Sequence, residues 1–239
     1  KTLAERCGGV AVSRYENYDV CYDAVEKLTN SGIEQVTIHQ LLSVETYDQC
    51  MKAIDDCADD PRLAKLKAIL FLTLKPKGKR NKQNILKDVA KYRELVEYAM
   101  KRQVNIGFDS CSAPIFLMAM KDHPRFKDFS MMSESCESNR FSGYANAKGE
   151  YWHCSFTEEQ PGWKGIDLTK IEDFQKDVWM APEVIRFRDK LVGQCNDHID
   201  KECYLCPVFD LYNKDIGNAS DTTYHPTISI YAEKKVVQK

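Results

Sequence analysis

The first half of the chain alternates between two hydrophobic periods, one typical of strands and one typical of helices. Residues 84–102 give the clearest helical pattern, because apolar side chains recur every three or four positions from Ile85 to Met100. Residues 68–74 read AILFLTL, an apolar run typical of a strand that is covered on both faces. The same reasoning predicts further strands at 9–15, 35–42 and 104–108, and further helices at 18–30, 46–58 and 114–120.

Strands and helices that alternate at this spacing predict a parallel sheet with right-handed crossovers. Four strands are too few for a complete barrel, so we expect residues 1–121 to form a partial (β/α) barrel or a short open sheet. In such sheets the functional residues gather at the carboxyl ends of the strands. Those ends carry Ser43 and the segments 13–16, 75–79 and 109–111, none of which names a chemistry by itself.

Two polar features of these strands each have two interpretations. His39 shares a strand face with Thr37 and Leu41, so it points either into a barrel lumen or into a hydrogen-bonded place in the core. The basic segment 75–80 either binds a carboxylate or phosphate or forms a solvated loop.

The second half, residues 122–239, has a different character. Glycines, aromatic residues and cysteines become more frequent, and long helical periodicity fades. Residues 143–153 predict a β-hairpin that turns near 146–149. Residues 173–192 predict a helix that is broken near Pro182. We therefore expect a fold of the α/β class with a second, smaller domain over residues 122–239.

Composition and charge narrow the class of protein. The chain is 43% hydrophobic and 29% charged, which is ordinary globular composition. It holds 34 Lys and Arg against 36 Asp and Glu, so it has no basic surplus for nucleic acid or an anionic membrane. The longest apolar stretches are too short to span a bilayer, and no export leader is visible. We expect a cytoplasmic protein without nucleic-acid or membrane partners, and, because it opens on Lys1, one whose sequence continues in front.

Ten cysteines suggest metal binding, because disulfides are rare in a reducing compartment. Cys21, Cys50 and Cys57 lie on or beside apolar helix faces and are expected in the core. In the second half, Cys136 is followed by twelve residues, a glycine, four residues and Cys154, and a hairpin would bring these two thiols together. Further along the chain, Cys203 and Cys206 are separated by two residues, which places both sulfurs within one turn, the close spacing that metal ligands require.

Four thiolates suit either a structural zinc ion or a [4Fe–4S] cluster. The long interval between Cys136 and Cys154 is looser than the two to four residues of a zinc-ribbon knuckle, which favours the cluster. Zinc stays open as the alternative metal. Cys111 and Cys195 are the substitute ligands if one of Cys136, Cys154, Cys203 or Cys206 is not used.

The segment 136–156, CESNRFSGYANAKGEYWHCSF, resembles the carboxyl-terminal extension of radical S-adenosylmethionine (radical SAM) enzymes of the SPASM/twitch type. That family is marked by a cysteine, nine to fifteen residues, a glycine, four residues and a cysteine, followed later by a CxxC element. The strand segments VAVSRY, VTIHQLLS, FLTLKPKG and IGFDSC also resemble the later strands of the family's partial barrel, and VWMAPEVIRFR resembles the stretch before its last cysteines. The resemblance covers nearly the whole chain, and the cysteine spacing is its most specific part.

The resemblance implies a partial barrel followed by a twitch-like domain with one auxiliary [4Fe–4S] cluster on Cys136, Cys154, Cys203 and Cys206. It implies a peptide or protein substrate, and a contact from Ser13 to S-adenosylmethionine. The motif that binds the radical-generating cluster, CxxxCxxC, does not occur in residues 1–239, so the resemblance places it upstream. The visible chain cannot start a radical by itself.

Two other function classes remain. The chain is a non-catalytic relative or binding module if its four thiolates hold zinc or iron–sulfur only structurally. It is an α/β enzyme unrelated to radicals if its cysteines are scattered through the core. The sequence does not disclose the substrate or the oligomeric state.

Overall fold

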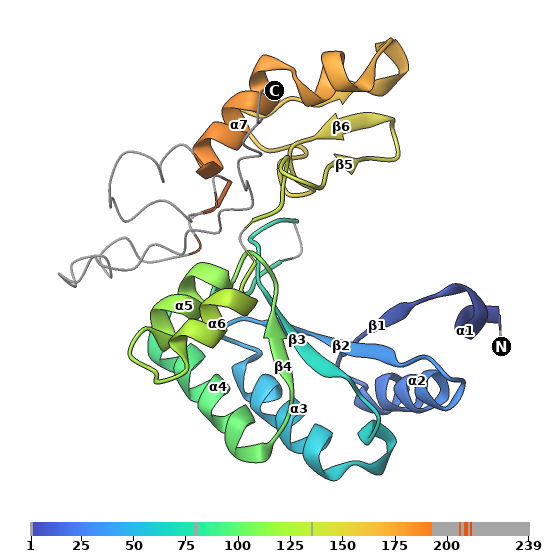
Figure 1. Ribbon diagram of the computed structural model, residues 1–239, viewed down its shortest axis with the longest axis vertical. Helices are drawn as coiled ribbons and strands as arrows, with labels where there is room; N and C mark the ends of the chain where they lie inside the picture. The colour runs from blue at the N-terminus through green and yellow to red at the C-terminus, as the bar shows by residue number, and fades with distance from the viewer. Residues whose placement is uncertain are drawn as a thin grey trace, which may run out of the picture.

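The computed structural model describes residues 2–78, 81–134 and 136–192, together with residues 206, 208, 209 and 211. A larger lobe is built on a parallel sheet in the order β1-β2-β3-β4, and a smaller lobe on an antiparallel sheet in the order β5-β6-β7 (Figure 1). The strands of the larger lobe are β1 (Gly9–Ser13), β2 (Gln35–Leu42), β3 (Ala68–Thr73) and β4 (Ile106–Phe108). Its helices are α1 (Thr2–Arg6), α2 (Tyr18–Asn30), α3 (Tyr47–Asp59), α4 (Val89–Arg102), α5 (Ala113–Met120) and α6 (Phe126–Met132).

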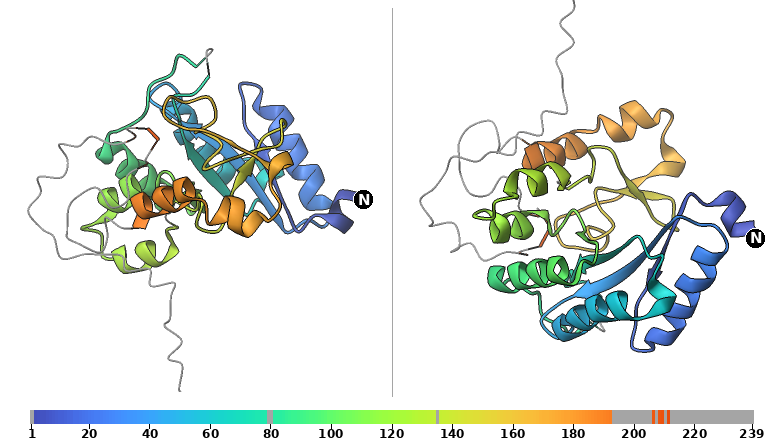
Figure 2. Two further views of the ribbon diagram at one scale, coloured as in Figure 1. Left: turned by 90° about the horizontal axis from the view of Figure 1, so that it is seen from above. Right: turned by 60° about the horizontal axis from the view of Figure 1, so that its bottom comes forward.

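The parallel sheet is covered by helices on one face. In β2, Val36, Ile38 and Leu42 are buried in one core with residues of α2, α3 and α4, while Thr37 and His39 are only partly buried on the opposite face. Buried and partly buried side chains therefore alternate along β2, as the pleat of a strand requires. His39 lies on the face of β2 that points away from α2, α3 and α4 and is only partly buried, so its interpretation as a core histidine was wrong. Figure 2 shows α2, α3 and α4, in blue to green, on the side of the sheet that lies away from the smaller lobe.

The α/β class and the parallel sheet are confirmed, and the predicted bounds of β2 and α2 agree with the structure. Helix α4 begins at Val89, five residues later than its apolar periodicity predicts. The side chain of Asp88 caps the helix by accepting a hydrogen bond from the N–H of Ala90 at 2.8 Å. Leu86 lies in the irregular segment before this cap, yet its side chain is buried. The finer prediction, a partial barrel, stays a prediction.

The smaller lobe consists of β5 (Tyr144–Ala145), β6 (Glu150–Trp152) and β7 (Ile166–Asp167), followed by a π-helical segment (Gln175–Trp179) and α7 (Pro182–Val192). The predicted hairpin is confirmed, as is the break at Pro182. Asn146 fixes the hairpin turn, because its Oδ1 accepts from the N–H groups of Lys148 at 2.9 Å and Glu150 at 3.0 Å. Gly149 completes the turn at φ 76°, which favours glycine.

The division at residue 121 stays a prediction. Helix α6 follows that position, and its Phe126 and Phe129 pack against the core of the larger lobe. Residue 211 lies beyond the smaller lobe in sequence, yet Leu211 is 1% exposed in the same larger core. The chain therefore leaves the larger lobe, builds the smaller one and returns. None of the helices in the described ranges combines the length and the apolar character needed to cross a bilayer.

A polar network ties β1 to α2 and α3 beneath the sheet. Arg14 follows β1, and its Nε donates to the hydroxyl of Tyr22 at 2.8 Å, while that hydroxyl donates to Asp56 Oδ2 at 2.7 Å. Lys52 donates to the other oxygen of Asp56 at 2.8 Å. Burial acts to raise the pKa of Asp56, but the hydrogen bonds from Lys52 and Tyr22 outweigh it, so the pKa is lowered.

This lowered pKa predicts an acid-dependent loss of stability. An aspartate with a lowered folded-state pKa stabilises the fold above its unfolded pKa of about 3.9, and this contribution disappears as the pH falls through the folded pKa. We expect Asp56→Asn to be less stable than the native chain at neutral pH and the difference to shrink in acid. Urea midpoints measured from about pH 2 to pH 7 test it, because the difference should shrink below about pH 4. The control Asp128→Asn alters an exposed pair with Arg125 and should leave the profile unchanged; a pH-independent difference for Asp56→Asn would contradict the prediction.

Candidate functional site

A buried ion pair marks the carboxyl ends of β3 and β4. Lys75 follows β3 and Asp109 follows β4, and Lys75 Nζ donates to Asp109 Oδ2 with side chains that are only 8% and 17% exposed. The other carboxylate oxygen, Oδ1, accepts from the N–H of Ser112 at 3.1 Å and from the Ser112 hydroxyl at 2.5 Å. Of the two interpretations of the basic segment, the solvated loop was wrong for Lys75, because its side chain is only 8% exposed and is held by the Asp109 carboxylate.

Hydroxyl groups extend the ion pair into the core. Ser112 Oγ also lies against Thr73 Oγ1, which is 2.9 Å from the hydroxyl of Tyr92 in α4. Thr73 and Ser112 are buried, so each hydroxyl needs its partners to offset its lost hydration. The series of hydrogen bonds from Tyr92 through Thr73 and Ser112 to Asp109 therefore holds the Asp109 carboxylate in one orientation.

Cys111 lies two residues after Asp109 and packs against the larger core. Burial raises the pKa of its thiol to about 12, the charge of Lys75 opposes this increase, and Asp109, Cys206 and Cys136 add to it. Cys111 is therefore a protonated thiol at neutral pH that has two of the predicted metal ligands as electrostatic neighbours.

The segment around Cys206 lies beside the segment around Cys154. The ring of Phe156 is 6.1 Å from the ring of Phe209, in an edge-to-face arrangement. Lys75 Nζ lies 5.5 Å from the centroid of the same Phe156 ring, and Lys77 Nζ donates to the carbonyl of Ser155 at 2.7 Å. The loop after β3 thus holds the Cys154 segment, and that segment in turn contacts the returning chain.

Cys206 is half-buried, and its sulfur is surrounded by groups that act on its charge. Burial raises the pKa of its thiol, the backbone N–H groups of Phe209 and Val208 lower it by hydrogen bonding to the sulfur, and Cys136 and Cys154 raise it. Like charges would repel if all three thiols ionised without a cation between them. A metal centre binds deprotonated thiolates, and its positive charge would offset the repulsion between them.

The predicted ligands are brought together only in part. Cys136, Cys154 and Cys206 are electrostatic neighbours at the carboxyl ends of β3 and β4, whereas Cys203 and Cys195 lie outside the described residues. Within the described ranges, no three Cys, His, Asp or Glu side chains are gathered closely enough to hold a metal ion. The three thiols are therefore neighbours whose donor chemistry suits iron–sulfur or zinc, but they are not by themselves a closed ligand set.

Ser13, the predicted contact for S-adenosylmethionine, lies at the exposed end of β1 and pairs in register with His39 of β2. Because β1 and β4 are opposite edges of the sheet, Ser13 is three strand spacings, roughly 14 Å, from the end of β4. Sequence reasoning placed both Lys75 and Asp109 at strand ends but did not pair them. The available signal was that β3 and β4 are consecutive parallel strands, whose carboxyl ends meet at one edge.

Comparison of the chain with models of protein families, with curated proteins and with solved structures gives no match.

Proposed function

We propose that this chain is the carboxyl-terminal part of a radical SAM enzyme of the SPASM/twitch type, with one auxiliary [4Fe–4S] cluster on Cys136, Cys154, Cys203 and Cys206. One observation carries the proposal: the chain returns from the smaller lobe so that the Cys206 segment lies against the Cys154 segment, through Phe209 and Phe156. These cysteines are far apart in sequence, and nothing in the local pattern of either segment requires them to meet.

The residues around the thiols suit a centre of this kind. The backbone N–H groups of Val208 and Phe209 act to lower the pKa of the Cys206 thiol, and hydrogen bonds to sulfur are a means by which proteins tune iron–sulfur centres. The ion pair of Lys75 and Asp109 lies beside Cys111, where the lysine acts to lower the pKa of the thiol and the aspartate acts to raise it. Asp109 and its hydroxyl partners hold Lys75 in place.

The roles of the remaining residues follow from the same proposal. A bound auxiliary cluster passes electrons or holds a substrate close to the reacting centre. Ser13, at the carboxyl end of β1, would contact S-adenosylmethionine, whose cleavage needs the CxxxCxxC motif that residues 1–239 do not contain. The substrate would be a side chain of a peptide or protein, and the protein would work in the reducing cytoplasm.

Iron and sulfide analysis tests the proposal. After anaerobic reconstitution with iron and sulfide, we expect about four iron atoms and about four sulfides per chain, as a single [4Fe–4S] cluster requires. A chain that retains about one zinc and no iron would instead be a non-catalytic module with a structural Cys₄ site. Retention of neither metal would contradict both assignments and leave an α/β protein with unrelated chemistry.

A further inference from the structure

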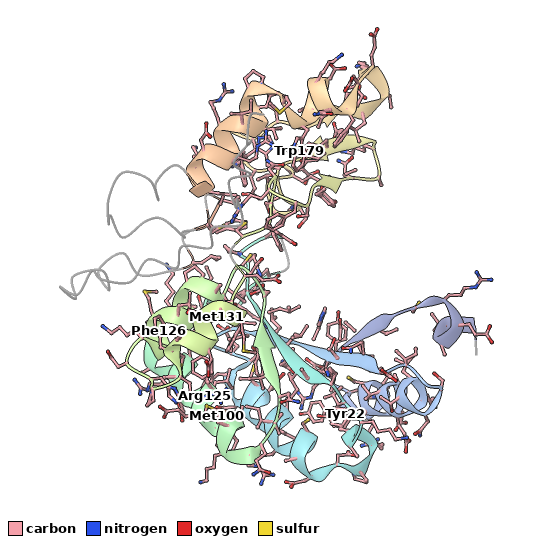
Figure 3. All side chains as sticks on the ribbon, viewed as in Figure 1. Tyr22, Met100, Arg125, Phe126, Met131 and Trp179 are labelled. Atoms are coloured by element: carbon pink, nitrogen blue, oxygen red, sulfur yellow. The ribbon has the colours of Figure 1, made fainter. Side chains whose placement is uncertain are left out.

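A groove follows the outer edge of β4, with a volume of about 310 Å³ and mostly apolar walls. We call it the β4-edge groove; it is lined along the whole of β4 and by side chains of α4, α5 and α6, including Val96, Phe116 and Met132. Phe116 lies between Phe108 and Phe129, with ring centroids 5.1 Å and 5.7 Å away, and these rings form a rigid aromatic wall. Figure 3 shows Met131 and Phe126 of α6 on the same side of the larger lobe as Met100 of α4.

The backbone of β4 offers hydrogen bonds to this groove. The carbonyl of Asn105 accepts from the N–H of Ile69 at 3.0 Å, and the N–H of Asp109 donates to the carbonyl of Phe71 at 3.1 Å. Because consecutive residues of a strand direct their backbone groups to opposite sides, the N–H and C=O groups of Ile106 and Phe108 point away from β3. In the part of the chain that the structure describes, β3 is the one strand paired with β4.

These features determine what kind of molecule fits. A donor and an acceptor repeated along a strand edge are matched by another extended backbone, and a lipid or small apolar molecule would leave them unpaired. Met100 and Met132 at the groove are 40% and 78% exposed, and methionine adapts to varied side chains. The ionisable groups that line it are Asp109, whose charge is already met by Lys75, and Glu134, without a lysine, arginine or histidine among the lining residues, so Glu134 favours a positive charge at that end.

We propose that the β4-edge groove binds an extended peptide segment, basic at one end, which adds to the parallel sheet as a strand beside β4. Its alternate apolar side chains would lie between α4 and α6, and its basic end would lie near Glu134 and the carboxyl end of β4. That end also carries Asp109 and Cys111, so the peptide would approach the thiols along the strand. The bound peptide would be the substrate of the proposed enzyme. Its binding to the groove does not depend on the proposed function; only its later reaction does.

The test is binding of a defined probe to the whole chain. The probe is a fluorescent, capped peptide of about eight residues that alternates valine and threonine and ends in lysine, long enough to extend beyond the three residues of β4 at both ends. We expect saturable binding by fluorescence anisotropy. Methylating one alternating set of its backbone nitrogens should abolish binding, and methylating the other set should preserve it, because only one set faces β4. Equal effects of both sets, or no binding up to about 1 mM, would overturn the proposal.

Two exposed methionines provide a matched pair of variants. Met131 and Met132 are neighbours in α6 and are 76% and 78% exposed, but only Met132 lines the groove. We expect Met132→Asn to weaken peptide binding about tenfold and Met131→Asn to leave it within about twofold. Equal weakening would overturn the assignment. A second edge variant, Ile106→Pro, removes one outward N–H without removing a bond to β3, and it should weaken binding while its unfolding temperature shows that it folds.

Two further outcomes separate this inference from its competitors. If the chain forms dimers in sedimentation, and Met132→Asn but not Met131→Asn restores monomers, the groove pairs with a second copy of the chain and the peptide assignment is overturned. Binding of the peptide by a chain that retains no iron would support this inference while contradicting the proposed function. Iron loading without peptide binding would support the proposed function and contradict this inference.

Discussion

Cys206→Ser is expected to lower the iron retained by the reconstituted chain from about four atoms to less than one. A serine hydroxyl is a harder and far less acidic ligand than a thiolate, so it does not replace sulfur in such a centre. The position matters because Cys206 is the described cysteine whose pKa is raised by both Cys136 and Cys154. Metal analysis and visible absorption of the purified variant measure the loss.

Cys57→Ser is the matched control. Cys57 is half-buried like Cys206, and burial likewise raises the pKa of its thiol, but it belongs to α3 beneath the sheet. We expect this variant to retain the full iron content. Full iron in Cys206→Ser, or equal losses in both variants, would contradict the proposed ligand set.

Cys111→Ser separates a ligand from a neighbour. Cys111 is close enough to Cys136 and Cys206 for their charges to act on it, yet it is not in the proposed ligand set. We expect this variant to retain the iron. If Cys111→Ser loses the iron while Cys203→Ser retains it, Cys111 replaces Cys203 as the fourth ligand.

The local pattern of the sequence was enough to predict the strands and helices whose side chains alternate. In β2, the buried positions Val36, Ile38 and Leu42 follow the period of a strand, so its bounds were predicted without error. The start of α4 was not predicted because Ile85 and Leu86 continue the apolar pattern while Asp88 ends it by capping. Helix α6, with seven residues, is too short for its period to be recognised.

The candidate site shows where local pattern stops being informative. Close spacing selected Cys203 and Cys206 as candidates, whereas Cys136 and Cys154 were paired through the hairpin that the sequence predicts between them. The pairing of Lys75 with Asp109 leaves none, since the two residues come from different strands and meet only when the sheet forms. The same is true of the contact between Phe156 and Phe209, which depends on the path of the chain through the smaller lobe.

Replacing Arg14 is expected to have the largest effect on stability in the described part of the larger lobe. The side chain is fully buried, its guanidinium lies 4.1 Å from the centroid of the Tyr18 ring, and it donates to Gln40 Oε1 at 2.9 Å. Arg14→Met fills a similar volume but removes the donor to Gln40 Oε1 and to the Tyr22 hydroxyl, and it removes the 3.4 Å contact to Asp56. Removing one partner of a buried pair costs about 3–5 kcal/mol, and we expect about 3 kcal/mol because Asp56 keeps its bond to Lys52.

Thermal unfolding measures this loss, and a matched arginine separates burial from charge. For a chain of this size, about 3 kcal/mol corresponds to a fall in Tm of roughly 6–12 °C. Arg93→Met also removes a paired arginine, but Arg93 and Glu97 are 40% and 51% exposed, so its cost should be about 0.3–0.5 kcal/mol. Arg14→Lys should fall between the two, because an ammonium keeps the charge but lacks the planar guanidinium that reaches Tyr22, Gln40 and Asp56 together. Equal costs for Arg14→Met and Arg93→Met would mean that the network beneath β1 does not hold the strand in place.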